Sequence, residues 1–269
     1  MESDQEGSRL KIKGNAETTA EQLVSTGLLR LPNNANVVDA GSGVGFVSAV
    51  MAKLIDENQL TCQINLVDQS DLRLQQAKND LRPLQTANVK FQYISSDLNN
   101  ISLPSNFGDY VFSRFVFEYL ATPEEVFAEL YRITKVGGKM VVGDLDYNGL
   151  THYPLEPLLE RKLAVVMDQL RNLKLLDPYA GRKIYSFFHK HKLKDVKIQV
   201  IPHHLFYGKL TSADQFNWDA KFNQLISYQS EGILKFDFDV KDFKHKFMKF
   251  LKSEERFTYT PLILVEGVK

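Results

Sequence analysis

The chain has 269 residues, enough for one large domain with a substantial buried core. Lys and Arg together number 33, as do Asp and Glu, so no net field favours binding to nucleic acid or to an acidic membrane surface. The single cysteine, Cys62, excludes internal disulfides and zinc clusters built from cysteine.

The sequence contains no apolar stretch of the roughly 18 residues that a membrane-spanning helix needs, and its acidic start does not resemble a secretory signal. These features predict a cytoplasmic protein without integral membrane association. Residues 1–15 are polar and are expected to form a tail, while the whole chain, 1–269, is interpreted as a single domain.

Short apolar runs alternate with segments of helical periodicity through the first half of the chain. Strands are predicted at 36–40, 64–67, 89–94, 109–113 and 139–143, and helices at 16–29, 46–55, 71–81 and 123–134, with a turn at 136–138. Each connection between parallel strands must be long enough to hold a helix. The alternation therefore predicts an α/β fold with a parallel sheet covered on both faces.

The pattern changes after Asp144. Helices are predicted at 155–173 and 182–192, and strands at 196–201 and 258–266. The stretch between these two strands is too long for an ordinary loop, and the apolar side chains of 240–251 recur at helical spacing. We therefore expect a helical insertion over residues 202–257 that covers the ligand-binding edge of the sheet.

The motif VVDAGSGVG, residues 37–45, joins the first strand of the sheet to a helix. Its glycines allow the backbone to approach a ligand closely, and the helix that follows offers free amide groups. The dinucleotide pattern G-x-G-x-x-G needs a third glycine where this chain has Phe46, which makes a nicotinamide-dependent oxidoreductase the weaker alternative. Asp39 adds a carboxylate beside the turn, which favours an ammonium group over an anion.

Two further carboxylates follow neighbouring strands at the same edge. Asp68 ends the second strand, where it can accept hydrogen bonds from two ribose hydroxyls, and Asp97 follows the third strand. Together with Asp39 and the glycine turn, they predict a site for a ribose-bearing, partly cationic ligand.

With these motifs the chain resembles the class I S-adenosylmethionine-dependent methyltransferases, especially the small-molecule enzymes that methylate ubiquinone and menaquinone precursors. The resemblance is carried by VVDAGSGVG, LVDQS, SSDL, the segment from Asp109 to Asp146 and TPLILVEG. It implies a Rossmann-like, mostly parallel seven-stranded sheet in the order 3-2-1-4-5-7-6, with the last strand antiparallel.

The resemblance also implies S-adenosyl-L-methionine as the cofactor, S-adenosyl-L-homocysteine as its product, and no need for a metal. Asp39 would assist near the amino group of the cofactor, and Asp68 would bind the ribose, followed by Gln69. Asp97 would bind the adenine amino group, with Leu98 packing beside the ring. The positions matched to the methionine part are Gly41, Ser42, Gly43, Gly45, Ser113 and Arg114.

Two residues are candidate catalytic bases. Glu118 occupies a position where many relatives carry histidine, and His152 has a side chain that titrates near neutral pH. One of His203 and His204 could reach the substrate. Trp218 and the aromatic residues around it could either wall an apolar acceptor pocket or form a small core beneath the insertion.

The sequence thus predicts methyl transfer, by in-line displacement, to a small acceptor that is aromatic or quinone-like. It indicates no nucleic-acid partner and is compatible with a monomer or a homodimer. The alternatives are a nicotinamide-dependent oxidoreductase and a catalytically silent domain that binds S-adenosylmethionine.

Overall fold

The computed structural model describes residues 15–269, so most of the tail predicted at 1–15 lies outside the described residues. Seven strands form one large sheet in the order β3-β2-β1-β4-β5-β10-β7. These strands are β1 (Ala35–Ala40), β2 (Cys62–Asp68), β3 (Val89–Ser95), β4 (Gly108–Arg114), β5 (Thr134–Leu145), β7 (Lys194–Pro202) and β10 (Pro261–Val268).

Strand β10 pairs antiparallel with both β5 and β7, whereas the pairs among β1 to β5 are all parallel. In chain order β7 and β10 are the sixth and seventh strands of this sheet. The predicted order 3-2-1-4-5-7-6, with an antiparallel last strand, is therefore confirmed.

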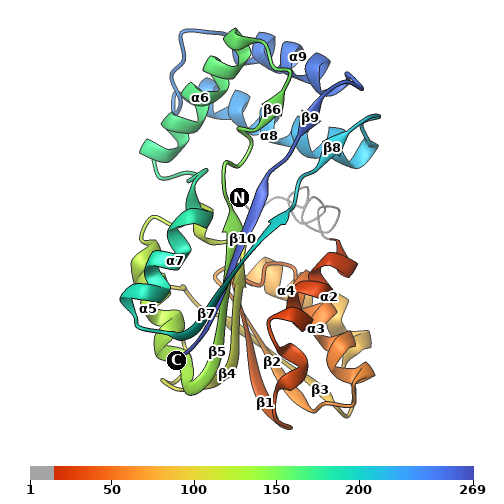
Figure 1. Cartoon of the computed structure of the whole chain (residues 1–269), viewed down its shortest axis with the longest axis vertical. Coiled ribbons are helices and arrows are strands. Elements are labelled where there is room, and N and C mark those ends of the chain that lie inside the picture. Colours follow the sequence, from red (N-terminus) through yellow and green to blue (C-terminus); the bar gives the residue numbers. More distant parts are fainter. Residues whose placement is uncertain (1–14) are drawn as a thin grey trace.

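Helices cover both faces of the sheet (Figure 1). One face packs against α2, α3 and α4, and the other against α5 and α7. The bounds are α2 (Ala16–Ser25), α3 (Phe46–Glu57), α4 (Asp71–Leu81), α5 (Pro123–Ile133) and α7 (Ala180–Lys190), with short 3₁₀ helices η1 (Leu28–Arg30), η2 (Arg82–Leu84) and η3 (Phe117–Tyr119). This is the predicted α/β arrangement.

A separate layer lies beyond the ends of strands β5, β7 and β10, at the top of Figure 1. We call it the cap. It has its own apolar cluster, in which side chains of three helices pack together. Its elements are β6 (His152–Tyr153), α6 (Pro157–Asn172), β8 (Phe206–Tyr207), α8 (Ser212–Ser230), α9 (Val240–Leu251) and β9 (Phe257–Thr258).

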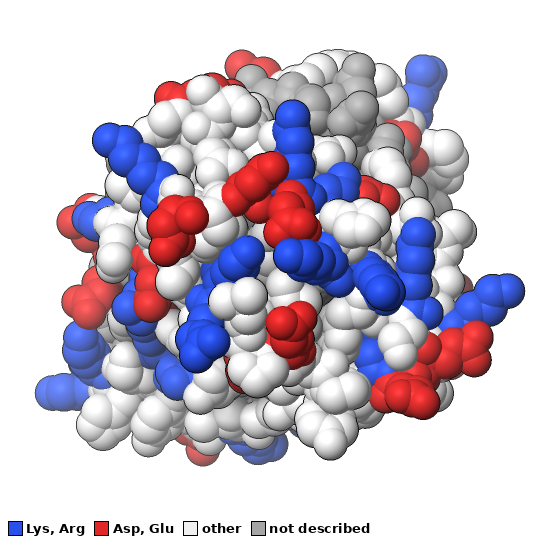
Figure 2. Space-filling model, turned by 90° about the horizontal axis from the view of Figure 1, so that it is seen from above, with Lys and Arg blue, Asp and Glu red and all other residues white. Residues whose placement is uncertain are grey.

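The cap differs from the predicted insertion in two ways. It includes α6 and β6, which precede residues 202–257, and it contains a small three-stranded sheet in the order β6-β9-β8. The strand predicted at 258–266 is divided between β9 in that sheet and β10 in the large one. Lysines and acidic side chains are interspersed over the outer surface of the cap, as Figure 2 shows, in keeping with the neutral net charge.

The turn predicted at 136–138 lies within β5, which runs without a break from Thr134 to Leu145. Gly137 has a positive φ of 78°, and the pairing register with β4 shifts between Gly108 and Tyr110. Between these pairs β5 advances five residues while β4 advances two, so the strand bulges at the predicted turn without ending there. Among the helices of residues 15–269, none is long and apolar enough to cross a bilayer.

Candidate active site

A cavity of about 630 Å³ lies between the edge of the large sheet and the cap. This volume is in the range of small-molecule sites. Its walls come from α2, the loops after β1, β2, β3 and β4, the segment from Pro202 to Phe206, and the first half of α8. The cavity thus joins the predicted cofactor residues to residues of the cap.

The glycine loop folds back over the end of β2. The amides of Gly41 and Ser42 both donate to the carbonyl oxygen of Val67, at 2.8 and 3.1 Å. Gly45 has a φ of 78°, and a Cβ atom there would lie 3.0 Å from Leu81 Cδ1. A larger side chain would therefore strain the backbone and push α4 away. Gly41, Ser42 and Gly43 line the cavity, whereas Gly45 lies behind them and supports the turn.

Asp39 is buried near the end of β1 and accepts a hydrogen bond of 2.7 Å from the hydroxyl of Ser48. Burial raises the pKa of this carboxyl to about 6, although the hydrogen bond from Ser48 and the positive charge of Arg114 oppose the rise. A carboxylate that is costly to bury alone is stabilised by a cationic ligand group. Asp39 lines the cavity, where it can meet such a group.

Asp68 ends β2 and braces two loops. Its Oδ2 accepts from the amide of Gly43 at 2.8 Å, and its Oδ1 accepts from the amide of Ser70 at 2.9 Å. Each carboxylate oxygen can accept a further hydrogen bond. Asp68 and the adjacent Gln69 both line the cavity, so the carboxylate faces ligand while it holds the glycine loop in place.

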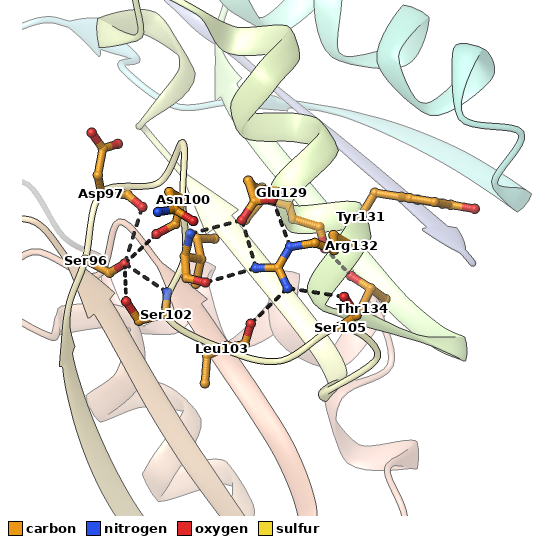
Figure 3. Close-up of polar contacts among 12 residues, drawn as sticks. Ser96, Asp97, Asn100, Ser102, Leu103, Ser105, Glu129, Tyr131, Arg132 and Thr134 are labelled. Carbon is orange, nitrogen blue, oxygen red and sulfur yellow. Dashed lines mark hydrogen bonds and ion pairs between the residues drawn. The ribbon is translucent and has the colours of Figure 1, made fainter.

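Asp97 and Leu98 line the cavity from the loop after β3. This loop is anchored by Arg132 of α5, as Figure 3 shows. Arg132 donates to the carbonyl oxygens of Ile101 and Leu103, each at 2.9 Å, and pairs with Glu129. These bonds hold the loop on the side of α5. The side chain of Asp97 stays exposed and lines the cavity.

We expect Arg132→Met to weaken cofactor binding without slowing the chemical step, because the loop that carries Asp97 and Leu98 loses its anchor. The dissociation constant for S-adenosylhomocysteine should rise about tenfold, since several charge-assisted hydrogen bonds are lost. Isothermal titration calorimetry measures the change. Lys135→Met, which breaks an ion pair with Asp109 away from the cavity, is the matched control and should leave the affinity unchanged.

Arg114 and Ser113, the two cofactor contacts predicted at the end of β4, lie in different surroundings. Arg114 lines the cavity and donates from Nη1 to Gln22 and Thr19 of α2, at 2.6 and 3.2 Å. Burial lowers its pKa to about 10, and the negative charge of Asp39 limits the fall. Ser113 is fully buried in the sheet and does not line the cavity. We therefore correct its assignment as a cofactor contact.

Glu118 lies on η3, lines the cavity and is only 1% exposed. Its Oε2 accepts a hydrogen bond of 2.5 Å from Nδ2 of Asn148. Its Oε1 is buried and has no hydrogen-bond partner within residues 15–269. Glu118 therefore presents a carboxylate oxygen that a donor group of a ligand could satisfy.

His152 lies inside the cap and not at the cavity. The rings of Trp218 and Phe247 lie 5.7 and 5.1 Å from its imidazole. Its Nδ1 lies 2.8 Å from the hydroxyl of Thr258, and its Nε2 lies 2.9 Å from the carbonyl oxygen of Gly149. Both ring nitrogens are occupied and burial lowers the pKa to about 4, so we correct the interpretation of His152 as a base.

His152 should instead make the stability of the fold dependent on pH. The unfolded chain binds a proton near pH 6.5 that the folded chain takes up only near pH 4, so wild-type stability falls as the pH drops through this window. The slope is at most about 1.4 kcal/mol per pH unit. His152→Gln removes this contribution.

Calorimetric melting of both proteins should therefore show a deficit for the variant near neutral pH that shrinks as the solution is acidified. Asp39 titrates in the same window with the opposite sign, but it is common to both proteins and cancels from the difference. A deficit that stays constant with pH would contradict the buried, neutral state of His152.

The acceptor end of the cavity also contains residues that sequence reasoning only partly anticipated. Phe115, His203 and His204 form a row of rings with centroid separations of 4.7 and 4.4 Å. Of the aromatic residues near Trp218, that residue and Phe206 line the cavity, while Phe222 belongs to the core of the cap. Thr19 and Gln22 of α2 and Asn217 and Lys221 of α8 also line it, and no local motif indicates them.

Comparisons with known proteins agree with this geometry. Residues 38–142 match the family model described as "Methyltransferase domain". The 2-methyl-6-phytyl-1,4-hydroquinone methyltransferase of spinach is 33% identical over 109 residues, and that of Arabidopsis thaliana is 30% identical over 103 residues. These matches cover 40% and 38% of this chain but only 29% and 28% of the relatives.

Solved structures extend the similarity in fold to nearly the whole chain. The YcgJ protein of Bacillus subtilis has a TM-score of 0.60 at 15% identity, and the match covers 94% of this chain and 98% of that one. Phosphoethanolamine N-methyltransferase 2 of Haemonchus contortus, solved with S-adenosylmethionine, has a TM-score of 0.55 at 17% identity over 94% of this chain and 52% of that one. Residues 38–142 thus match a methyltransferase domain, and the large sheet has the fold of solved S-adenosylmethionine-dependent methyltransferases.

Proposed function

We propose that the chain transfers a methyl group from S-adenosylmethionine to a small acceptor that carries a hydroxyl group on an aromatic ring. The observation that supports this most directly is the single cavity that joins the glycine loop and Asp68 to Glu118 and a wall of aromatic rings. The cofactor and the acceptor can meet there away from bulk water.

The residues present suit the cofactor. Asp68 would accept hydrogen bonds from the ribose hydroxyls, Asp97 and Leu98 would hold the adenine, and the buried carboxylate of Asp39 would balance the positive charge of the amino group. When bound, the cofactor supplies an electrophilic methyl group on a sulfonium. Arg114 would reach the carboxylate of the methionine part from the end of β4.

The residues of this chain would orient the acceptor and accept the proton of its hydroxyl group. The rings of Phe115, His203 and Trp218 would hold an aromatic acceptor between the sheet and the cap. A hydroxylated ring becomes a better nucleophile when its proton leaves, and Glu118 Oε1 is the carboxylate oxygen available to receive it. The O–H electron pair would then stay with the acceptor and make it the nucleophile for the methyl group, and the sulfonium sulfur would leave with the electron pair of the broken bond.

The names of the curated relatives describe a hydroquinone as their substrate, which supports a quinol-like acceptor for this chain. Those names also describe the relatives as chloroplastic, and the cytoplasmic location expected from the sequence stays a prediction. The absence of a nucleic-acid partner and the oligomeric state likewise stay predictions.

Radiolabelled methyl transfer tests the proposal. The full chain is incubated with methyl-labelled S-adenosylmethionine and reduced 2-methyl-6-phytyl-1,4-hydroquinone in detergent, and label is counted in the organic phase. We expect transfer to the hydroquinone and none to the oxidised quinone, which has no hydroxyl proton to give. Cofactor binding without transfer to this or to simpler hydroquinones would favour a catalytically silent binding domain, and a response to NADH alone would favour the oxidoreductase alternative.

A further inference from the structure

Glu118 is held at three points, which is unusual restraint for a side chain at a ligand cavity. Its amide donates to Oδ2 of Asp144 at 3.0 Å, and its carbonyl oxygen accepts from the amide of Asp177 at 2.7 Å. The third point is the side-chain bond from Asn148 to Oε2. The backbone and one carboxylate oxygen are therefore fixed before any acceptor arrives.

Asn148 is itself immobilised and lies outside the cavity. It is 5% exposed, and its amide donates to the carbonyl oxygen of Pro178 at 3.0 Å. It follows Tyr147, whose φ of 50° turns the chain sharply after β5. The carboxamide of Asn148 thus reaches Glu118 from behind and does not line the space an acceptor would fill.

The hydrogen bond from Asn148 gives the two carboxylate oxygens of Glu118 different surroundings. Oε2 is engaged by an amide N–H, whereas Oε1 has no hydrogen-bond partner in the described part of the chain. A buried carboxylate oxygen without a donor is costly, and a donor on a ligand would remove that cost.

We propose that Asn148 is a positioning residue for methyl transfer: its amide fixes the Glu118 carboxylate and leaves Oε1 for the hydroxyl of the acceptor. This inference rests on the proposed function, because it assigns the acceptor proton to Glu118. Asn148 lies outside the cavity. It acts through the carboxylate it holds, and so its loss should lower kcat while cofactor binding stays unchanged, which a general loss of structure would not do.

The test compares Asn148→Leu with the wild type, using reduced 2-methyl-6-phytyl-1,4-hydroquinone as acceptor. We expect kcat for the hydroquinone to fall about tenfold, because the carboxylate that takes the acceptor proton has lost the donor that holds it in place. KM for the cofactor should not change. Asn65→Leu is the matched control, since Asn65 is a buried asparagine whose amide donates to the carbonyl oxygen of Val37 in the sheet, away from the cavity. It should lower the melting temperature without lowering kcat.

Asn148→Asp covers the case in which the leucine variant does not fold, because it keeps the shape of the side chain and places a second carboxyl beside Glu118. Its kcat should also fall, because an aspartate carboxylate has no N–H to donate to Oε2. A folded variant with the wild-type kcat would overturn the proposal.

A second measurement needs no methyl acceptor and so separates this inference from the proposed function. Infrared difference spectra between the wild type and Glu118→Gln, with glutamate labelled with carbon-13, identify the carboxylate band of Glu118. In Asn148→Leu the frequency of this band should change, because Oε2 has lost its hydrogen-bond donor. If it changes while no hydroquinone is methylated, the proposed acceptor is wrong and the positioning role stands. If the band is identical in both proteins, the positioning role is wrong.

Discussion

Asp68→Ala is expected to abolish useful cofactor affinity, with the dissociation constant for S-adenosylhomocysteine rising about a hundredfold or more. The substitution removes the acceptor proposed for the ribose hydroxyls and also frees the amides of Gly43 and Ser70, which the carboxylate now holds. Hydrogen bonds to a charged group contribute about 1.5–3 kcal/mol each, and tenfold in affinity corresponds to about 1.4 kcal/mol. Titration calorimetry on protein freed of bound ligand measures the loss.

Two companion variants make the result interpretable. Asp68→Asn keeps one oxygen and the shape of the side chain, so its affinity should lie between those of the wild type and the alanine variant. Asp71→Asn removes a nearby exposed carboxylate at the start of α4 and should bind as the wild type does. Wild-type affinity in a folded Asp68→Ala protein would contradict the ribose assignment.

Glu118→Gln is expected to reduce kcat for methyl transfer to the hydroquinone by about a hundredfold or more, the usual range for loss of a positioned proton acceptor. Glutamine keeps the size of the side chain and can still face the acceptor, but it cannot take its proton. Affinity for S-adenosylhomocysteine should stay near that of the wild type, because Glu118 lies at the other end of the cavity.

Steady-state assays across a range of pH check this expectation. Glu125→Gln, an exposed carboxylate on α5, serves as the control for charge alone and should leave kcat unchanged. Full turnover by Glu118→Gln throughout the range would show that the acceptor needs no base from this residue.

Much of the large sheet could be predicted because its signals are local. The helix α4 begins and ends where expected, at Asp71 and Leu81, because Ser70 caps its first turn and Pro83 lies two residues after its last residue. The cofactor end of the cavity could be predicted for the same reason, since Asp39, Asp68 and the glycines each lie where a strand ends.

The cap and the acceptor end depended on contacts between distant segments, which local pattern does not specify. His152 titrates near neutral pH in isolation, but β6 pairs with β9 more than a hundred residues later and buries the ring beside Thr258. Ser113 follows the predicted strand correctly, yet the alternation of side chains along β4 turns it into the sheet while Arg114 faces the cavity. Asn148 carried no signal, because its partner Glu118 lies thirty residues earlier.

The cap is joined only to the half of the sheet that contains β5, β7 and β10, whereas the glycine loop and the carboxylates that follow β2 and β3 belong to the other half. The matched domain model stops at residue 142, close to the end of β5 and before the first cap element. The residues proposed to hold the cofactor therefore all precede the cap, whereas the wall proposed for the acceptor combines His203 and Trp218 with Phe115 and Glu118 from the earlier stretch. Grafting the stretch after β5 from another protein of this fold should change which acceptors fit the cavity while the cofactor stays the same.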